Sequence, residues 1–358
     1  MTDFIMNSLK DKVYVGIDVH KRTYSVTALG AGIGKKTASM SASPSALITF
    51  LEKHFSDKEI NTVYEAGFGG FHLHRQLKAS NINNIIVNPA SIETAANQKV
   101  KTDKKDSYKL AEHLSQNRIK GIRVPTAQEE SKRLLTRTRN QLTAHKVRTG
   151  NQIKSKLFLF GLIDCNNESV MSKKYLDHIK TLNLNGELKV VIDCLANLWI
   201  YLSEQIKNID LELKKQANID VNLESVYRSV PGVGPLSARI LANELGDMSQ
   251  FKNERRLFSF VGLTPTEHSS GENIKQGHIT RQGAARLRKV LTECAWVNIS
   301  KDPAMAEVFD RIAARRGKKR AIVAVARRLI GKIRACFKKN TLYKIDILNT
   351  KEAKNDED

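Results

Sequence analysis

The stretch YVGIDVHKRTYSVTAL, residues 14–29, decides the fold of the first part of this chain. It holds two apolar runs joined by a short polar turn, which is the pattern of two adjacent strands. The first run ends at Asp18, and a carboxylate at the end of an apolar strand is costly unless it meets a cation. Asp18 is therefore a candidate functional residue at the edge of a sheet.

Three further acids could meet Asp18. Glu65 closes the apolar run NTVYEA, and Asp103 and Asp106 stand three residues apart in VKTDKKDSYKLAEHL, on one face of a helix. Converging carboxylates predict a hard divalent cation, most simply Mg²⁺, with two ions possible. Five lysines around the last pair suit a phosphodiester substrate: Lys99, Lys101, Lys104, Lys105 and Lys109.

The composition favours a polyanionic partner. The formal net charge is +22, which predicts nucleic acid. No run approaches the roughly 20 apolar residues of a membrane-spanning helix, and the N-terminus lacks a signal pattern, so we expect a cytosolic protein that does not bind membranes. The four cysteines are widely spaced, and His72 and His74 have no partners at ligand spacing, which argues against a disulfide framework and a zinc site.

Residues 11–125 alternate strand-like and helical patterns. The predicted strands are VYVGIDV, RTYSVTAL, NTVYEA and NIIVNP, and the predicted helices are PSALITFLEKHF, FHLHRQLKAS and one from about Ser107. Two neighbouring strands followed by α/β alternation suit a ribonuclease H-like sheet. In that fold, acids on the first strand, a later central strand and a following helix meet at one end of the sheet.

Residues 126–222 have the pattern of long helices and predict a helical coiled-coil spacer. A first helix is expected from about Glu129 to Phe160, and polar breaks separate it from a second. The second carries a seam with coiled-coil spacing: Leu188, Val191, Leu195, Leu198, Leu202, Ile206, Ile209 and Leu213. The two helices could form a hairpin within one chain, or the seam could be a dimerisation arm.

Residues 223–340 predict a mainly helical domain, followed by a polar tail, 341–358, whose end is expected to be disordered. The domain begins with SVPGVGPLSARILANELGD, in which Gly232 and Gly234 belong to a tight turn that opens a helix. This is the pattern of a helix-hairpin-helix, whose backbone N–H groups can hold a phosphate. An ordinary turn between two helices would look the same.

Basic and hydroxyl side chains fill the rest of this domain. In GLTPTEHSSGENIKQGHITRQGAARLR, a serine could attack phosphorus while cations stabilise the developing charge, although serine in a glycine-rich loop is more often a turn residue. Residues 311–339 hold twelve Lys and Arg and no acid, which favours phosphate binding over a merely solvated face. The cations expected to touch nucleic acid are Lys275, Arg281, Arg286, Arg288, Arg315, Arg316, Lys318, Lys319, Arg320, Arg327 and Arg328.

The motifs IDVHK, YEAG, KTDKKD, PGVGPLSARILANELGD, GLTPTEHSSG, HITRQGAARLR and KKRAIVAVARRLI stand in one order along residues 14–337. In this order the chain resembles the DEDD-type transposases of the insertion-sequence one-ten (IS110) family, which includes the Piv-like invertases. HSSG and the length of the last domain look more like its eleven-eleven (IS1111) subgroup.

The resemblance implies more than the spacing does. It implies a RuvC-like domain whose acids Asp18, Glu65, Asp103 and Asp106 are catalytic and bind Mg²⁺, and a nucleophilic serine in HSSG, with Ser270 favoured and Ser269 the alternative. It also implies recombination of donor and target DNA through a covalent phosphoserine, guided by a structured noncoding (bridge) RNA. Family members are prokaryotic and cytoplasmic, act on nucleoid DNA, and assemble from dimers into tetramers that unite the acids of one subunit with the serine of another.

Two other functions fit parts of the pattern. A metal-dependent, junction-resolving nuclease would use the same acids with water as nucleophile, and it would not need Ser269 or Ser270. A catalytically silent nucleic-acid-binding protein would keep the basic surface, but the intact set of four acids argues against it. Whether His268 helps to deprotonate the serine or only lines the turn is open.

Overall fold

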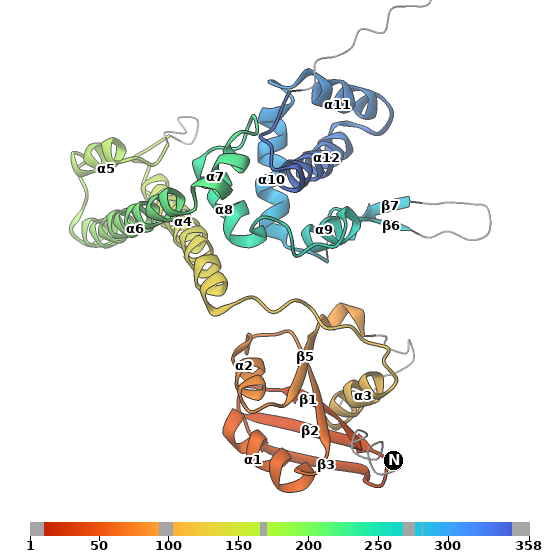
Figure 1. Cartoon of the computed structure of the whole chain (residues 1–358). Helices are drawn as coiled ribbons and strands as arrows, with labels where there is room; N and C mark the ends of the chain where they lie inside the picture. Colours follow the sequence, from red (N-terminus) through yellow and green to blue (C-terminus); the bar gives the residue numbers. More distant parts are fainter. Residues whose placement is uncertain (1–10, 93–102, 165–169, 268–275, 281, 346–358) are drawn as a thin grey trace, which may run out of the picture. The chain divides into compact units, whose positions relative to one another are not determined.

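The computed structural model describes residues 11–92, 103–164, 170–267, 276–280 and 282–345 (Figure 1). The chain divides into two compact units, the first ending at Pro125 and the second beginning at Thr126. Four residues predicted to act on nucleic acid lie outside the described residues: Ser269, Ser270, Lys275 and Arg281.

A five-stranded sheet of order β3-β2-β1-β4-β5 forms the first unit. The strands are β1 (Lys12–Val19), β2 (Thr23–Gly30), β3 (Gly34–Ser41), β4 (Glu59–Glu65) and β5 (Asn83–Val87). Strands β1, β2 and β3 pair antiparallel, whereas β1, β4 and β5 run parallel. The carboxyl ends of the two central strands β1 and β4 therefore lie at the same edge of the sheet.

Helices cover both faces of this sheet (Figure 1). They are α1 (Pro44–Phe55), α2 (His72–Ala79) and α3 (Asp103–Ser115), and a 3₁₀ turn spans Pro89–Ser91. On one face Val15 and Ile17 of β1 share a core with Leu47 of α1 and Leu77 of α2. The opposite face, reached by alternate residues of each strand, packs against Leu110 of α3.

The α/β pattern predicted for the first unit is confirmed, with two corrections. Strand β3 was not predicted, because GKKTASMS holds only two apolar residues, Ala38 and Met40, and lies at the edge of the sheet. The expectation of a helix from about Ser107 is wrong, since α3 begins at Asp103. Both predicted acids stand in its first turn, where a negative charge interacts favourably with the helix dipole.

Two long antiparallel helices begin the second unit. Helix α4 (Ala127–Leu159) pairs with α6 (Gly186–Ile219), and α5 (Lys173–Lys180) packs against them. A capping box at Thr126 starts α4. Arg139, in the first half of α4, pairs with Asp210, in the second half of α6, as antiparallel packing requires. Of the two arrangements that the sequence left open, the structure shows the hairpin within one chain.

The predicted seam of α6 is wrong at two positions in its first half, whereas Leu188, its first residue, is buried as predicted. Val191 and Leu198 were placed in the seam but are 40% and 45% exposed, whereas Ile192 and Trp199 are buried. The buried face is rotated because α5 packs beside α4 and both cover this part of α6. Leu202 and Leu213, farther along the seam, are buried as expected.

The remaining elements of the second unit are mostly helical, and the helices among them share one core. They are α7 (Val221–Arg228), α8 (Pro235–Leu245), α9 (Glu254–Val261), β6 (Pro265–Glu267), β7 (Gln276–Ile279), α10 (Ala285–Asn298), α11 (Pro303–Arg316) and α12 (Lys318–Lys339). The two short strands pair antiparallel. Within the part of the chain that the structure describes, no helix is both long and apolar enough to cross a membrane.

Candidate active site

Close packing of α3 on β1 builds the acid site. Gly16 of β1 faces α3, and a Cβ atom added there would overlap the backbone of Ser107 and crowd Ala111. The absence of a side chain therefore lets the helix backbone rest directly on the strand. Beside this contact, the hydroxyls of Ser107 and Thr27 form a buried hydrogen bond of 2.8 Å. The first turn of α3 is thereby held near the end of β1.

The register of β1 and β4 brings the first two acids together. Ile17 pairs with Tyr64 in the parallel ladder, so Asp18 and Glu65 are the next residues on adjacent strands. Since side chains alternate along a strand, both acids belong to the face that carries Gly16, which is the face covered by α3.

His20 joins these acids and was not predicted as a site residue. Its Nε2 atom lies 3.0 Å from Oδ2 of Asp18 and 3.4 Å from Oδ1 of Asp103. One potential ligand atom from each of these three residues lies within 4.8 Å of the others. The sequence signal was the IDVH spacing, because a residue two positions after Asp18 can return to the same side of the strand.

Electrostatics at this edge favour a cation. Burial raises the pKa of Asp18 above its ordinary value of 3.8. Next in size, the contact with His20 lowers this pKa, while the charges of Asp103 and Asp106 raise it. Their influence places both acids of α3 near Asp18, and carboxylates gathered in this way fit a divalent metal ion.

The acid site is an open edge rather than an enclosed pocket. The side chain of Asp18 is 21% exposed and that of Asp103 is 59% exposed. Glu65 is also exposed, and Asp106 is half-buried. Such an edge can be reached by a large substrate such as a nucleic acid strand.

The two glycines of the predicted turn in the second unit have different surroundings. Gly232 has φ +90°, and a Cβ there would meet the carbonyl oxygen of Cys294 at 2.6 Å, so this glycine packs the turn against α10. Asn298 also donates a hydrogen bond to the carbonyl oxygen of Pro231. Gly234 is exposed and precedes α8, with open space around it. Of the two, Gly234 leaves backbone accessible to a ligand.

Arg286 and Arg288, predicted to bind nucleic acid, both have partners within the protein. Nη1 of Arg286 lies 3.0 Å from Oε1 of the buried Glu244. Nη1 of Arg288 donates to the carbonyl oxygens of Val261, at 3.1 Å, and Gly283, at 2.9 Å. The second arginine thus joins the segment before β6 to the segment after β7.

Glycines allow these two segments to cross. Gly262 has φ +73°, and a Cβ on Gly283 would overlap the backbone of Phe260, Val261 and Gly262. Thr280 donates a backbone hydrogen bond to Thr264 just above the crossing. The crossing therefore forms the base of the β6–β7 hairpin.

Most of the cations predicted at the end of the chain adjoin Gly317, between α11 and α12, while Arg327 and Arg328 lie about three turns along α12. Those that are exposed are Arg315, Arg316, Lys318, Lys319, Arg320 and Arg328. Arg327 instead lies half-buried, with its guanidinium 4.5 Å from the ring centroid of Phe258. The exposed cations of the α11–α12 turn form a surface that suits phosphate groups.

Comparisons with known proteins agree with the motif order. Residues 15–160 match the DEDD transposase model named for IS110, and residues 225–310 match a model described as the transposase IS116/IS110/IS902 family. The chain belongs to the IS110 family of insertion-sequence transposases. The first match includes all four acids and His20, and the second includes Gly232, Gly234, Arg286 and Arg288.

Individual transposases are similar to this one over most of their length. The transposase for insertion sequence element IS1111A of Coxiella burnetii is 25% identical over 329 residues, covering 89% of this chain and 88% of the relative. The transposase for insertion sequence element IS1533 of Leptospira borgpetersenii is 29% identical over 304 residues, covering 80% and 86%. These relatives support placement in the IS110/IS1111 family.

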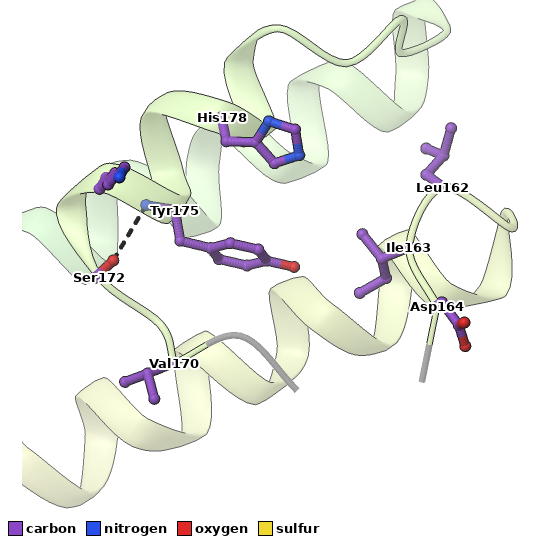
Figure 2. Close-up of a pocket in the computed structure, with 8 residues that line it drawn as sticks. Leu162, Ile163, Asp164, Val170, Ser172, Tyr175 and His178 are labelled. Atoms are coloured by element: carbon purple, nitrogen blue, oxygen red, sulfur yellow. Dashed lines mark hydrogen bonds between the residues drawn. The ribbon is translucent and has the colours of Figure 1, made fainter. Parts of the chain in front are cut away.

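A pocket of about 460 Å³ lies near the tip of the helical hairpin of this transposase (Figure 2). Tyr175 and His178 of α5 line it together with Ile163 and Asp164, which follow α4. In Figure 2 the ring of Tyr175 points toward Ile163. Of the predicted catalytic residues that the structure describes, none lines this pocket.

Proposed function

We propose that this IS110-family transposase breaks and rejoins DNA strands with a Mg²⁺-dependent acid site and a serine nucleophile. The observation that carries the proposal is the approach of Asp18 and Asp103 at the carboxyl end of β1, with Asp106 in the same first turn of α3 as Asp103. The order of strands and the covering helix support a ribonuclease H-like, RuvC-like domain. One or two Mg²⁺ ions would be held by these acids and Glu65.

The acids would position the divalent metal and the DNA. When bound, such a metal stabilises the attacking and leaving oxygens of an in-line displacement at phosphorus. Oxygen ligands suit a hard ion, and the open edge allows a strand to approach. Asp18 is the most restrained of these acids, because its strand is central in the sheet and α3 packs beside it.

Ser270 is proposed as the nucleophile, with Ser269 as the alternative. In the strand-breaking step, the bond from serine Oγ to phosphorus forms as one phosphorus–sugar oxygen bond breaks. The serine proton passes to solvent or a base, and the sugar oxygen leaves as a hydroxyl. The phosphoserine ester preserves the bond energy, so a second hydroxyl can rejoin the strand without an external energy source.

The base of the β6–β7 hairpin supports this assignment. The crossing at Gly262 and Gly283 and the clamp from Arg288 join the described residues on either side of the segment of sequence that contains both serines. We propose that Lys275, Arg281, the turn at Gly234 and the exposed cations around Gly317 contact phosphates. Arg286 and Arg288 would act on DNA indirectly, because each already binds groups of the protein.

Target choice is proposed to come from a noncoding guide RNA that pairs with donor and target DNA. Such pairing would leave the protein to contact backbones, which suits its net charge of +22. A dimer that assembles into a tetramer would bring acids and serine together from different chains. Exposed apolar residues on α6, namely Val190, Val191, Leu198 and Tyr201, leave a face available for such an assembly.

The function is tested by trapping the covalent intermediate. Purified protein, Mg²⁺, the noncoding RNA of its element and labelled donor and target DNA are combined and separated on a denaturing gel. We expect a DNA-linked protein band that disappears in Ser270→Ala and in Asp18→Asn but persists in Ser269→Ala. Loss of the DNA-linked band in Ser269→Ala but not in Ser270→Ala would identify Ser269 as the nucleophile. Cleavage without an adduct in wild type and both serine variants would identify a hydrolytic nuclease and overturn the proposal.

A further inference from the structure

We propose that His20 is a direct metal ligand of this site and gives it a mixed nitrogen and oxygen donor set that favours Mn²⁺ over Mg²⁺, relative to an all-carboxylate site. The inference rests on the proposed metal-dependent function and adds a residue and a metal preference to it. It is carried by the position of one imidazole between two of the acids.

The backbone fixes where His20 can reach. It follows β1 directly, and its backbone N–H donates to the carbonyl oxygen of Thr23 at 3.0 Å, which closes the turn into β2. The imidazole therefore begins from an anchored position rather than from a long loop. From there its Nε2 atom reaches carboxylate oxygens of both Asp18 and Asp103.

The distances fit one coordination sphere. Ligands about 2.1 Å from an octahedral ion lie about 3 Å apart when they are adjacent. The separations of Nε2 from the oxygens of Asp18 and Asp103 are 3.0 and 3.4 Å. With the three ligand atoms all within 4.8 Å of one another, these side chains would hold the same ion, and its other positions would be left for the remaining acids, water and DNA.

The alternative role of His20 is to pair with the acids as a cation. In that role the imidazolium would compete with a metal, and removing it would strengthen metal binding. Coordination predicts the reverse, because a neutral imidazole donates its lone pair to the ion. The two roles therefore predict opposite effects of the same substitution.

Imidazole also changes which ion is preferred. Mg²⁺ favours oxygen donors and retains its water, whereas transition ions such as Mn²⁺ accept imidazole nitrogen more readily. Replacing His20 should then cost more affinity for Mn²⁺ than for Mg²⁺. This difference is a property of the ligand set and does not require DNA or turnover.

The test uses Mn²⁺ itself as the probe, bound to the full chain without DNA or RNA. Pulsed electron paramagnetic resonance detects the ¹⁴N modulation of an imidazole coordinated to Mn²⁺, and calorimetry gives Mn²⁺ and Mg²⁺ affinities. His20→Gln is compared with wild type and with His54→Gln, which changes another histidine of the same unit that contacts Lys36 instead of the acids. Circular dichroism establishes that each variant is folded.

We expect ¹⁴N modulation in wild type and His54→Gln but not in His20→Gln. Mn²⁺ affinity should fall about 10-fold or more in His20→Gln, with a smaller loss for Mg²⁺. Absent modulation in wild type, persistent modulation in His20→Gln or tighter Mn²⁺ binding in that variant would overturn the inference. Because binding is read without DNA, a correct ligand assignment remains visible even if no serine adduct forms.

Discussion

Carboxylates are arranged in opposite ways in the two units of the molecule. In the first unit Asp18, Asp103 and Asp106 gather close enough for their charges to affect one another. In the second unit Glu244, only 3% exposed, binds Arg137 through both carboxylate oxygens and is also contacted by Arg286. Acids that crowd one another point to an external cation, whereas an acid enclosed by arginines points to structure.

A second ionic cluster follows the same rule in the second unit. Arg239 of α8 is buried near the junction of α6 and α7. Its Nη2 atom lies 3.1 Å from Oδ2 of Asp220, and its Nη1 atom lies 3.4 Å from Oε2 of Glu224. Lys132 of α4 also pairs with Asp220. These contacts tie the long hairpin to the C-terminal helices. Some of the positive charges of this basic protein, such as Arg239 and Lys132, therefore form internal ion pairs instead of facing nucleic acid.

The largest stability effect that tests this contrast is expected from Glu244→Gln. Removal of the charge leaves Arg137 and Arg286 without their shared anion, so the unfolding free energy should fall by about 3 kcal/mol. Denaturant titration measures it. The matched control Glu293→Gln, at an exposed pair with Lys289 on α10, should change it by less than about 0.5 kcal/mol. Equal effects would refute a structural role for the Glu244 cluster.

Gly16→Ala should disturb the acid site by moving α3. The added Cβ overlaps the backbone of Ser107, so we expect a loss of about 2 kcal/mol in stability together with weaker Mn²⁺ binding. Gly69→Ala is the control, because its Cβ would make only an ordinary contact of 3.5 Å with Val19. Thermal unfolding and metal calorimetry measure the two effects. Full metal affinity in Gly16→Ala would show that the position of α3 is not critical.

Arg288→Lys should have a smaller effect, confined to the hairpin base. The lysine side chain is one atom shorter, so its ammonium falls short of the Nη1 position that donates to both Val261 and Gly283, and the lost contact should cost about 1 kcal/mol. We expect DNA affinity close to wild type in a filter-binding assay but less serine adduct. The exposed Lys289→Arg serves as control. A large loss of DNA affinity with normal adduct yield per bound complex would instead indicate direct phosphate contact.

The smallest effect concerns Asp18 and pH. Since burial raises its pKa above 3.8, the folded state binds the proton more tightly than the unfolded state, and stability contributed by this group is lost as pH rises through that raised pKa. Without metal, Asp18→Asn should therefore melt at a higher temperature than wild type at pH 7, and this gain should shrink toward pH 4. The exposed Asp57→Asn is the control. A gain that grows as pH falls would contradict the stated direction.

The sequence predicts the first unit better than the second because its signals are local. Apolar strands ending in Asp18 and Glu65 and the spacing of Asp103 and Asp106 can be read directly, and parallel pairing then brings strand ends together. The edge strand β3 escaped prediction because it is mostly polar and holds only two apolar residues. His20 escaped because the IDVH spacing places it on the same side of the strand as Asp18 but does not show that its imidazole reaches the acids.

Partners of charged residues depend on distant parts of the chain. Arg286 and Arg288 look alike in GAARLR, yet one pairs with Glu244 of α8 and the other clamps the backbone beside Gly262. Nothing near them in sequence encodes these contacts. The same applies to the seam of α6, whose buried face is set by α5 as well as by α4. Long-range packing therefore limits how well nucleic-acid-binding residues can be predicted from charge alone.

The most direct test of the account is strand transfer by acid-site variants. Wild type, Asp18→Asn, Asp103→Asn and the exposed control Asp57→Asn are compared in recombination of donor and target DNA with the element's noncoding RNA, in Mg²⁺ or EDTA. We predict that wild type and Asp57→Asn recombine only with metal, and that both acid-site variants lose about 10³-fold or more in rate, since the metal supplies several kcal/mol of charge stabilisation. Metal-dependent recombination by Asp18→Asn at the wild-type rate would contradict the central claim.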